Sequence, residues 1–123
     1  LHPAVNYEDV PRYSADADVG LVSVKPTCLS YLYCLPNKLF EYIQAGLPVM
    51  VNDLPDCQSL LSDYGIGIAV QPDTAEQWRQ ELIQLKEQMH EGNADFSSGL
   101  RRAQSELTWE SESAVLKDVY VLD

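Results

Sequence analysis

Residues 34–53 have the sequence CLPNKLFEYIQAGLPVMVND, which predicts a helix, a tight turn and a buried strand in that order. Pro36 suits the first position of a helix, because the N–H that proline lacks would have no acceptor within the helix there. Gly46 suits the position just past the helix end, where the backbone often becomes left-handed. The apolar residues 47–51 then predict a strand.

The segments on either side continue this alternation of helix and strand. Before the quoted stretch, the pattern predicts a short helix, a strand and an irregular segment; after it, a helix closed by Gly65 and a third strand. These elements are expected at residues 9–17, 19–24, 25–35, 55–62 and 66–70. Alternating strands and helices indicate an α/β fold with a parallel sheet, right-handed crossovers and helices on both faces.

The last third of the chain predicts helices alone. Asp73 and Glu76 fit a capping box, and apolar residues at helical spacing extend that helix to just before Gly92. Two further helices are expected at 93–107 and 108–122, with Thr108 capping the second. The apolar residues expected to form the buried face of that last helix are Trp109, Leu116, Val119 and Tyr120.

The size and charge of the chain restrict its class. With 123 residues, 46% of them hydrophobic, we expect one domain over residues 1–123, and no apolar run approaches the roughly 20 residues that span a bilayer. The net charge of −11 disfavours nucleic acid and anionic membrane surfaces as partners. Because the chain does not begin with Met, we expect it to be part of a longer protein.

Three cysteines, Cys28, Cys34 and Cys57, show no paired spacing typical of a zinc site, and their odd number does not indicate a disulfide framework. We expect them to be small buried apolar residues in a protein of the reducing cytoplasm.

Charge placement in the central helix suggests an anion site. Lys38 falls in the first turn, where the helix dipole disfavours a cation, and Glu41 follows three residues later. Ligands of open α/β sheets bind beyond the carboxyl ends of the strands, and this helix starts at that edge. Its free N–H groups from Asn37 onward suit a phosphate, and the Glu41 carboxylate can accept hydrogen bonds from sugar hydroxyls. Two simpler interpretations remain open: a surface ion pair between Lys38 and Glu41, and local backbone bonding by Asn37.

Four stretches together resemble the C-terminal, donor-binding half of GT-B glycosyltransferases, particularly the retaining family-4-like enzymes. They are DVGLVSV at 18–24, LPNKLFEYIQAGLPVMV at 35–51, YGIGI at 64–68 and TWESE at 108–112. The resemblance implies a Rossmann-like three-layer α/β/α fold with C-terminal helices, forming part of a glycosyltransferase that binds a nucleotide-sugar and transfers the sugar to a glycan acceptor. It also implies an N-terminal half as the structural partner, and neither a metal nor another cofactor.

The resemblance also implies roles for individual residues. Glu41 corresponds to the glutamate that holds the ribose hydroxyls, and backbone contacts to the pyrophosphate are implied at Asn37, Lys38 and Leu39. Pro36, at the start of the helix, is a further donor-binding residue. Tyr33 stands where the family has the first glutamate of the pair, which contacts the transferred sugar. Its hydroxyl can bond a sugar, although Tyr31 and Tyr33 also suit a covering of apolar surface.

No residue is identified as catalytic, and this portion alone is expected to be inactive. Two other functions remain open. One is a non-catalytic α/β interaction or regulatory module, which the tyrosine at position 33 favours. The other is a GT-B-fold nucleotide-sugar epimerase. The nucleotide, the sugar and the acceptor are not indicated by the sequence.

Overall fold

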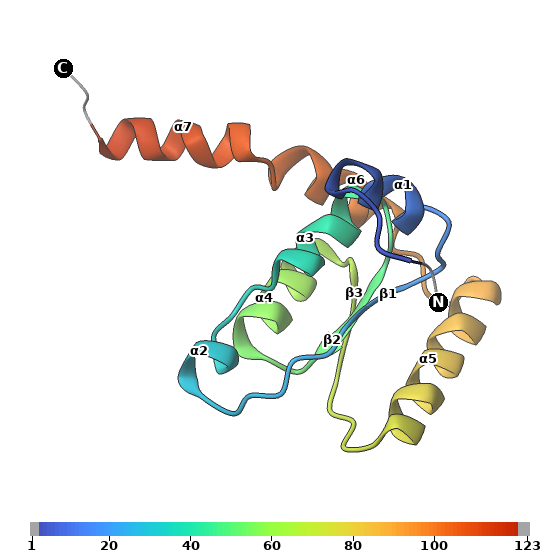
Figure 1. Cartoon of the computed structure of the whole chain (residues 1–123). Coiled ribbons are helices and arrows are strands. Elements are labelled where there is room, and N and C mark those ends of the chain that lie inside the picture. The colour runs from blue at the N-terminus through green and yellow to red at the C-terminus, as the bar shows by residue number, and fades with distance from the viewer. Residues whose placement is uncertain (1–2, 121–123) are drawn as a thin grey trace.

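The structure is a computed structural model that describes residues 3–120 (Figure 1). These residues form a short 3₁₀ helix, η1, seven α-helices and a three-stranded sheet. In chain order the elements are η1 (Tyr7–Asp9), α1 (Val10–Ser14), β1 (Gly20–Val22), α2 (Leu29–Leu32), α3 (Asn37–Gln44), β2 (Val49–Asn52), α4 (Pro55–Tyr64), β3 (Gly67–Val70), α5 (Ala75–His90), α6 (Ser97–Glu106) and α7 (Trp109–Val119). Within the described residues, no helix is both long and apolar enough to cross a membrane.

The sheet is parallel throughout, with β2 between β1 and β3. Val49 pairs with Gly20 on one side and with Gly67 on the other. The expected α/β fold with a parallel sheet is therefore confirmed. All three strands run the same way, so their carboxyl ends meet at one edge of the sheet, where the segments leading to α2, α4 and α5 begin.

Side chains of β2 alternate between two apolar clusters on opposite faces of the sheet. Val49 and Val51 pack with Leu39 and Ile43 of α3, in a cluster that also includes residues of α4 and α6. Met50 packs on the other face, in a cluster with residues of β3 and α5. Figure 1 shows the same division, with α3 and α4 on one side of the strands and α5 on the other.

The ends of the central helices largely follow the glycine and proline positions. Gly46 and Gly65 adopt positive φ angles of 75° and 66°, and Gly65 ends α4 as expected. Pro55 begins α4, also as expected. Pro36, however, is the extended residue that precedes α3, and not its first helical residue. Its carbonyl accepts a hydrogen bond of 2.9 Å from the N–H of Leu39, so Pro36 is the N-cap residue of α3.

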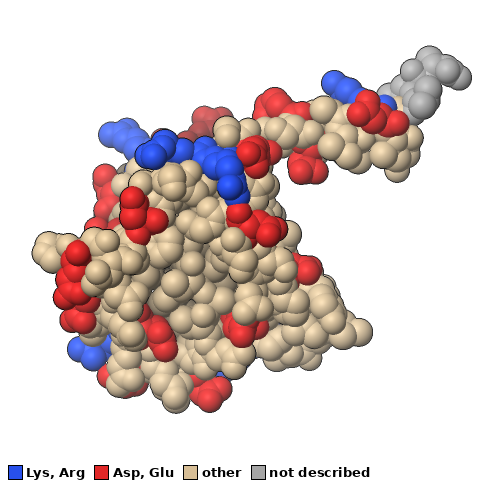
Figure 2. Space-filling view, turned by 180° about the vertical axis from the view of Figure 1, so that it is seen from behind, with Lys and Arg blue, Asp and Glu red and all other residues tan. Residues whose placement is uncertain are grey.

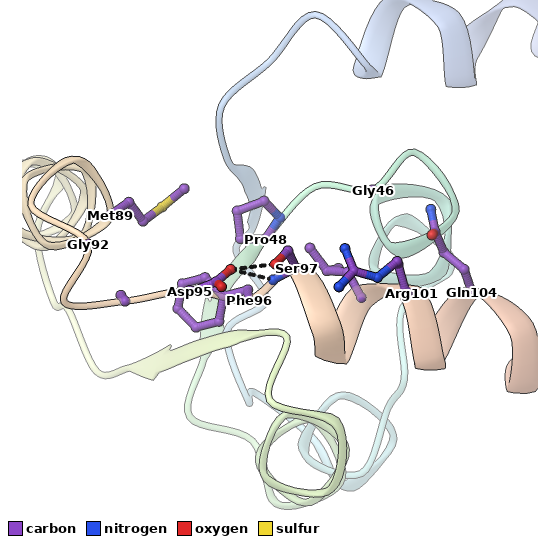
Figure 3. Close-up of a pocket in the computed structure, with 11 residues that line it drawn as sticks. Gly46, Pro48, Met89, Gly92, Asp95, Phe96, Ser97, Arg101 and Gln104 are labelled. Atoms are coloured by element: carbon purple, nitrogen blue, oxygen red, sulfur yellow. Dashed lines mark hydrogen bonds between the residues drawn. The ribbon is translucent and has the colours of Figure 1, made fainter.

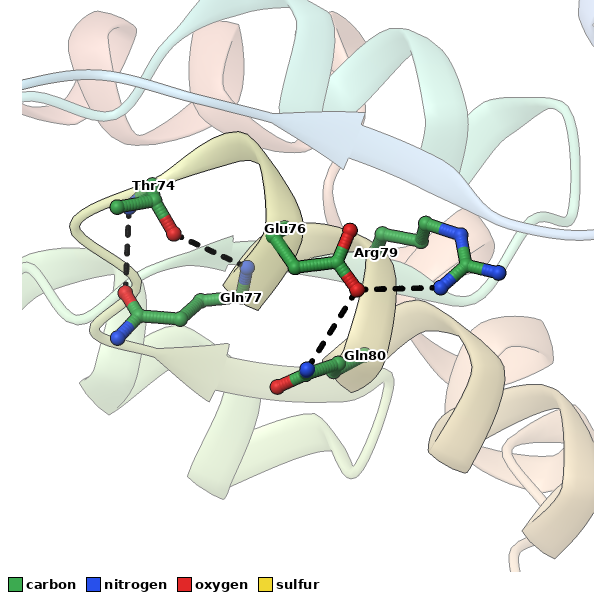
Figure 4. Close-up of polar contacts among 5 residues, drawn as sticks. All are labelled: Thr74, Glu76, Gln77, Arg79 and Gln80. Carbon is green, nitrogen blue, oxygen red and sulfur yellow. Dashed lines mark hydrogen bonds and ion pairs between the residues drawn. The ribbon is translucent and has the colours of Figure 1, made fainter.

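The predicted capping box of α5 is wrong by one residue. Thr74 is the N-cap, and its hydroxyl accepts a 3.2 Å hydrogen bond from the N–H of Gln77 (Figure 4). The Gln77 side chain in turn accepts from the N–H groups of Thr74 and Asp73, at 3.2 and 2.6 Å. The pairs Asp73–Glu76 and Thr74–Gln77 both have the spacing of a capping box. In the structure the second pair forms the box, and the side-chain oxygen of Gln77 accepts from two backbone N–H groups.

Glu76, the residue expected in that box, makes contacts along the helix surface. Its carboxylate accepts from Arg79 at 3.2 Å and from Gln80 at 3.5 Å (Figure 4). These are neighbours at i+3 and i+4, the spacing at which helical side chains meet.

The expected buried face of the last helix is also wrong. Thr108 caps α7 as predicted, accepting a 3.2 Å hydrogen bond from the N–H of Ser111. The helix then extends away from the body of the molecule (Figure 1), and Trp109 and Val119 are each 70% exposed, while Leu116 and Tyr120 are also exposed. An apolar face becomes buried only if another surface packs on it, and no described element covers α7. The expected end at Leu122 lies outside the described residues.

The segment 25–35, expected to be irregular, contains the one-turn helix α2. The N–H groups of Tyr31 and Leu32 both bond to the carbonyl of Cys28, at 3.1 and 2.9 Å. This turn has no buried residue, and Cys28 before it is exposed. Of the cysteines expected to be buried, Cys57 is fully buried and Cys34 partly so.

We predict that Gly67→Ala destabilises the protein more than Gly92→Ala. A Cβ atom at Gly67 would overlap the backbone carbonyl of Val49, where β2 and β3 pair. Overpacking of this kind costs about 2–3 kcal/mol. At Gly92, with φ of 75° and no neighbouring atom within 4 Å, only backbone strain of about 1 kcal/mol is expected.

Urea unfolding of both variants measures the two losses of stability. Equal losses, or a smaller loss for Gly67→Ala, would mean that the two strands do not approach as closely as described.

Candidate functional site

The start of α3 presents backbone donors that no side chain caps. The first N–H groups of an α-helix have no acceptor within the helix, and Pro36, at the cap position, has no side chain that could accept from them. The N–H of Leu39 bonds back to Pro36, whereas Asn37 and Lys38 are the first two helical residues and are exposed. Two donors therefore remain open at a helix end that carries partial positive charge.

Glu41 lies one turn further along α3 and lines a hollow of about 510 Å³. Asn37, four residues earlier, lines the same hollow, because residues at i and i+4 share a helix face. The rest of the lining is mostly apolar and includes Phe40 and the ring of Trp109 at the start of α7. Glu41 is partly buried there. Glu41 and Asn37 thus line one hollow together with the aromatic residues Phe40 and Trp109.

The surface ion pair considered from the sequence is not formed. Among the described residues, ion pairs join Arg79 to Glu76 and Lys86 to Asp18, and none joins Lys38 to Glu41. Lys38 is exposed beside the helix start and does not line the hollow. Its charge is therefore free to interact with an anion near the open N–H groups.

The remaining sequence candidates are placed differently. The Leu39 side chain is completely buried against the sheet, so only its backbone can contribute to binding. Tyr33 follows α2, is 58% exposed and does not line the Glu41 hollow. Tyr31 is 52% exposed. Neither tyrosine is among the described residues that pack against the two apolar clusters, and a covering of apolar surface by them stays a prediction.

A second hollow, of about 400 Å³, was not predicted. It lies where β2 and β3 end, and its polar lining includes Lys25, Asn52, Asp53 and Gln71. The Asn52 side chain accepts a 2.6 Å hydrogen bond from the N–H of Val24, which ties the segment after β1 to the end of β2. Gln71 donates to Asp53 at 2.6 Å. One feature of the sequence could have predicted this hollow: Asn52 and Asp53 fall at the end of a predicted apolar strand, at the edge of the sheet where α/β proteins bind ligands.

The largest of these hollows, of about 610 Å³, lies at the opposite, amino edge of the sheet between α5 and α6 (Figure 3). Pro48, just before β2, and Phe96 form part of its lining, together with Asp95 and Arg101. Hydrogen bonds from the hydroxyl and the backbone N–H of Ser97 lower the pKa of Asp95. The Asp95 carboxylate is therefore occupied by Ser97 at the start of α6. This hollow also lies at the amino edge of the sheet, whereas open α/β sheets bind ligands at the carboxyl edge.

Charge is unevenly distributed over the surface. Figure 2 shows acidic side chains spread across the face it presents, with the basic ones gathered mainly in a strip beside the base of α7. Helix α6 includes Arg101 and Arg102, and the guanidinium group of Arg102 lies over the Tyr64 ring, 4.7 Å from its centroid. Residues 3–120 contain no group of three or more His, Cys, Asp or Glu side chains placed to hold a metal ion.

We predict that Asn52→Ala loosens the segment after β1, whereas Asn52→Asp does not. Alanine removes the acceptor for the Val24 N–H, and leaving a partly buried donor unpaired costs about 1–2 kcal/mol. Aspartate keeps an oxygen in the same place. Hydrogen exchange at the Val24 amide should accelerate about tenfold in the alanine variant alone. Equal exchange in both variants would show that this hydrogen bond does not hold the segment.

Comparison with known proteins leaves the family of this chain open: no family model, no curated protein and no solved structure matches it. The candidate site around α3 consists of an uncapped helix start, a nearby lysine and a glutamate that lines the adjoining hollow.

Proposed function

We propose that this chain is the C-terminal, nucleotide-sugar-binding portion of a glycosyltransferase of the GT-B type, with a Rossmann-like three-layer fold. The observation that carries the proposal is the position of Glu41 in a hollow that begins at the uncapped start of α3. The described helices on both faces of a parallel sheet agree with such a fold. The donor would lie along the outer side of α3.

The helix start is the proposed diphosphate site. Anions bind at helix N-termini because free N–H groups point outward and the dipole favours negative charge. The N–H groups of Asn37 and Lys38 provide these donors, and the Lys38 ammonium adds a full positive charge nearby. This local compensation matters because the chain as a whole carries a net charge of −11.

Glu41 is the proposed ribose ligand. A rise of 1.5 Å per residue puts Glu41 about 6 Å along the helix axis from Asn37. That separation suits a ribose attached directly to the phosphate at the helix start. A carboxylate can accept hydrogen bonds from two neighbouring hydroxyls, and such charge-assisted bonds are stronger than neutral ones. Phe40 and Trp109 supply an apolar wall beside it.

In the transfer reaction these groups would stabilise the departing nucleoside diphosphate. Negative charge develops on the leaving phosphate as the glycosidic bond to it breaks, and preorganised donors lower the energy of that state. The helix start and Lys38 fill this role in the proposal without a metal. The glycan acceptor would bind to the N-terminal half of the enzyme, which would also supply the groups that activate it. We place this reaction in the cytoplasm.

A non-catalytic interaction or regulatory module is the second candidate. Tyr33 favours it, because it replaces a carboxylate expected to contact the transferred sugar and lies outside the Glu41 hollow. Sugar transfer by the intact enzyme would exclude this candidate.

We predict that a nucleoside diphosphate binds the protein and that Glu41→Gln weakens its binding at least tenfold. Hydrogen bonds to charged groups contribute about 1.5–3 kcal/mol, and 1.4 kcal/mol corresponds to a factor of ten in affinity. Calorimetric titration with UDP, GDP and ADP identifies the nucleotide and measures the loss.

Glu87→Gln is the matched control, since it removes the same charge from an exposed position on α5. Its affinity should equal that of the wild type. If Glu41→Gln binds as tightly as the control, Glu41 does not hold the ribose.

A further inference from the structure

Cys57 connects α4 to the segment that precedes α3. It lies in the first turn of α4 and is completely buried, and its thiol donates a 3.4 Å hydrogen bond to the carbonyl oxygen of Cys34. Cys34 is only two residues before Pro36, the N-cap of α3. Two residues far apart in the sequence thus meet beside the helix start.

Cys34 has a second, equally weak contact. Its thiol is partly exposed and donates a 3.1 Å hydrogen bond to the carbonyl of Tyr31 in α2. Thiols are weak donors, so little is lost when these two hydrogen bonds are given up. Burial raises the pKa of Cys57 to about 11, with further contributions from Cys34 and the adjacent Asp56. This raised pKa keeps Cys57 protonated at neutral pH, so the more exposed Cys34 is the thiol that reacts first.

A modest movement of the backbone at Cys34 would bring the two cysteines within disulfide distance. Standard bond lengths and the 3.4 Å contact place the two Cα atoms at most about 9 Å apart. A disulfide needs a Cα separation of about 4.4–6.8 Å. Cys34 lies between α2 and α3, outside any helix or strand, so it can approach Cys57 without breaking a regular hydrogen-bond ladder.

We infer that Cys34 and Cys57 form a reversible disulfide that ties the start of α3 to the first turn of α4. With a peroxide as oxidant, the sulfur of the more exposed Cys34 attacks one peroxide oxygen, and a sulfenic acid and one water are formed. The Cys57 sulfur then attacks the Cys34 sulfur, and the sulfenic hydroxyl leaves as a second water. Overall, two thiols lose two electrons and two protons, and one peroxide is reduced to two waters.

The disulfide would restrict the segment that leads into α3. A covalent link from Cys34 to the buried first turn of α4 would limit the conformations open to residues 33–36. Cys28 is not the partner, because it is exposed at the far end of α2. This inference depends on the positions of the two cysteines alone and does not require the proposed glycosyltransferase function.

The test is stoichiometric treatment of the whole protein with hydrogen peroxide, alkylation of the remaining thiols and peptide mass spectrometry without reductant. The expected product is a link between the Cys34 and Cys57 peptides, lighter by two hydrogen atoms and reversed by dithiothreitol. Cys28→Ser should form the same link. Cys34→Ser and Cys57→Ser should not form it, and the oxidised wild type should unfold several degrees higher than the reduced protein.

Because Cys57 is buried, its replacement by serine can disturb folding. Cys57→Val keeps the site apolar, and its circular dichroism spectrum shows whether a variant without the link is still folded. Cys34→Ser, at a partly exposed site, gives the same information with little risk to the core. The inference is overturned if the wild type yields a link through Cys28, links only between molecules, or a Cys34 sulfinic acid with Cys57 still free.

Discussion

The packing of α3 on the sheet is the contact on which the rest of the arrangement depends. Leu39 and Ile43 are completely buried against Val49 and Val51 of β2. Because these two residues share one face of the helix, the opposite face, with Asn37 and Glu41, is turned to the outside. The same anchoring holds the start of α3 near the carboxyl edge of the sheet. One face of α3 therefore packs in the core, and the opposite face carries the candidate site.

Much of the fold could be predicted from residues whose local effect is strong. Glycines at positive φ, Gly46 and Gly65, and the proline at the start of α4 mark element ends by backbone geometry alone. The register of the α5 cap could not be decided, because Asp73 with Glu76 and Thr74 with Gln77 satisfy the same pattern. Burial of α7 could not be predicted either, since an apolar helix face does not specify what packs on it.

In the candidate site, too, the features set by local sequence could be predicted and those set by long-range contacts could not. Asn37 and Glu41 share a hollow because they are four residues apart on a helix, which the sequence makes visible. The hollow at the carboxyl edge depends on Gln71 meeting Asp53 and on Asn52 meeting Val24. Such pairs arise only when separate strands come together in register, and nothing local in the sequence specifies them. The absence of a Lys38–Glu41 ion pair likewise reflects side-chain directions in three dimensions.

A ¹H–¹⁵N NMR titration with a nucleoside diphosphate tests whether α3 binds a diphosphate at its start. We expect the largest shifts at the amides of Asn37 and Lys38, with smaller shifts at Glu41 and around its hollow. Largest shifts at residues 95–101, in the hollow at the opposite edge of the sheet, would contradict it.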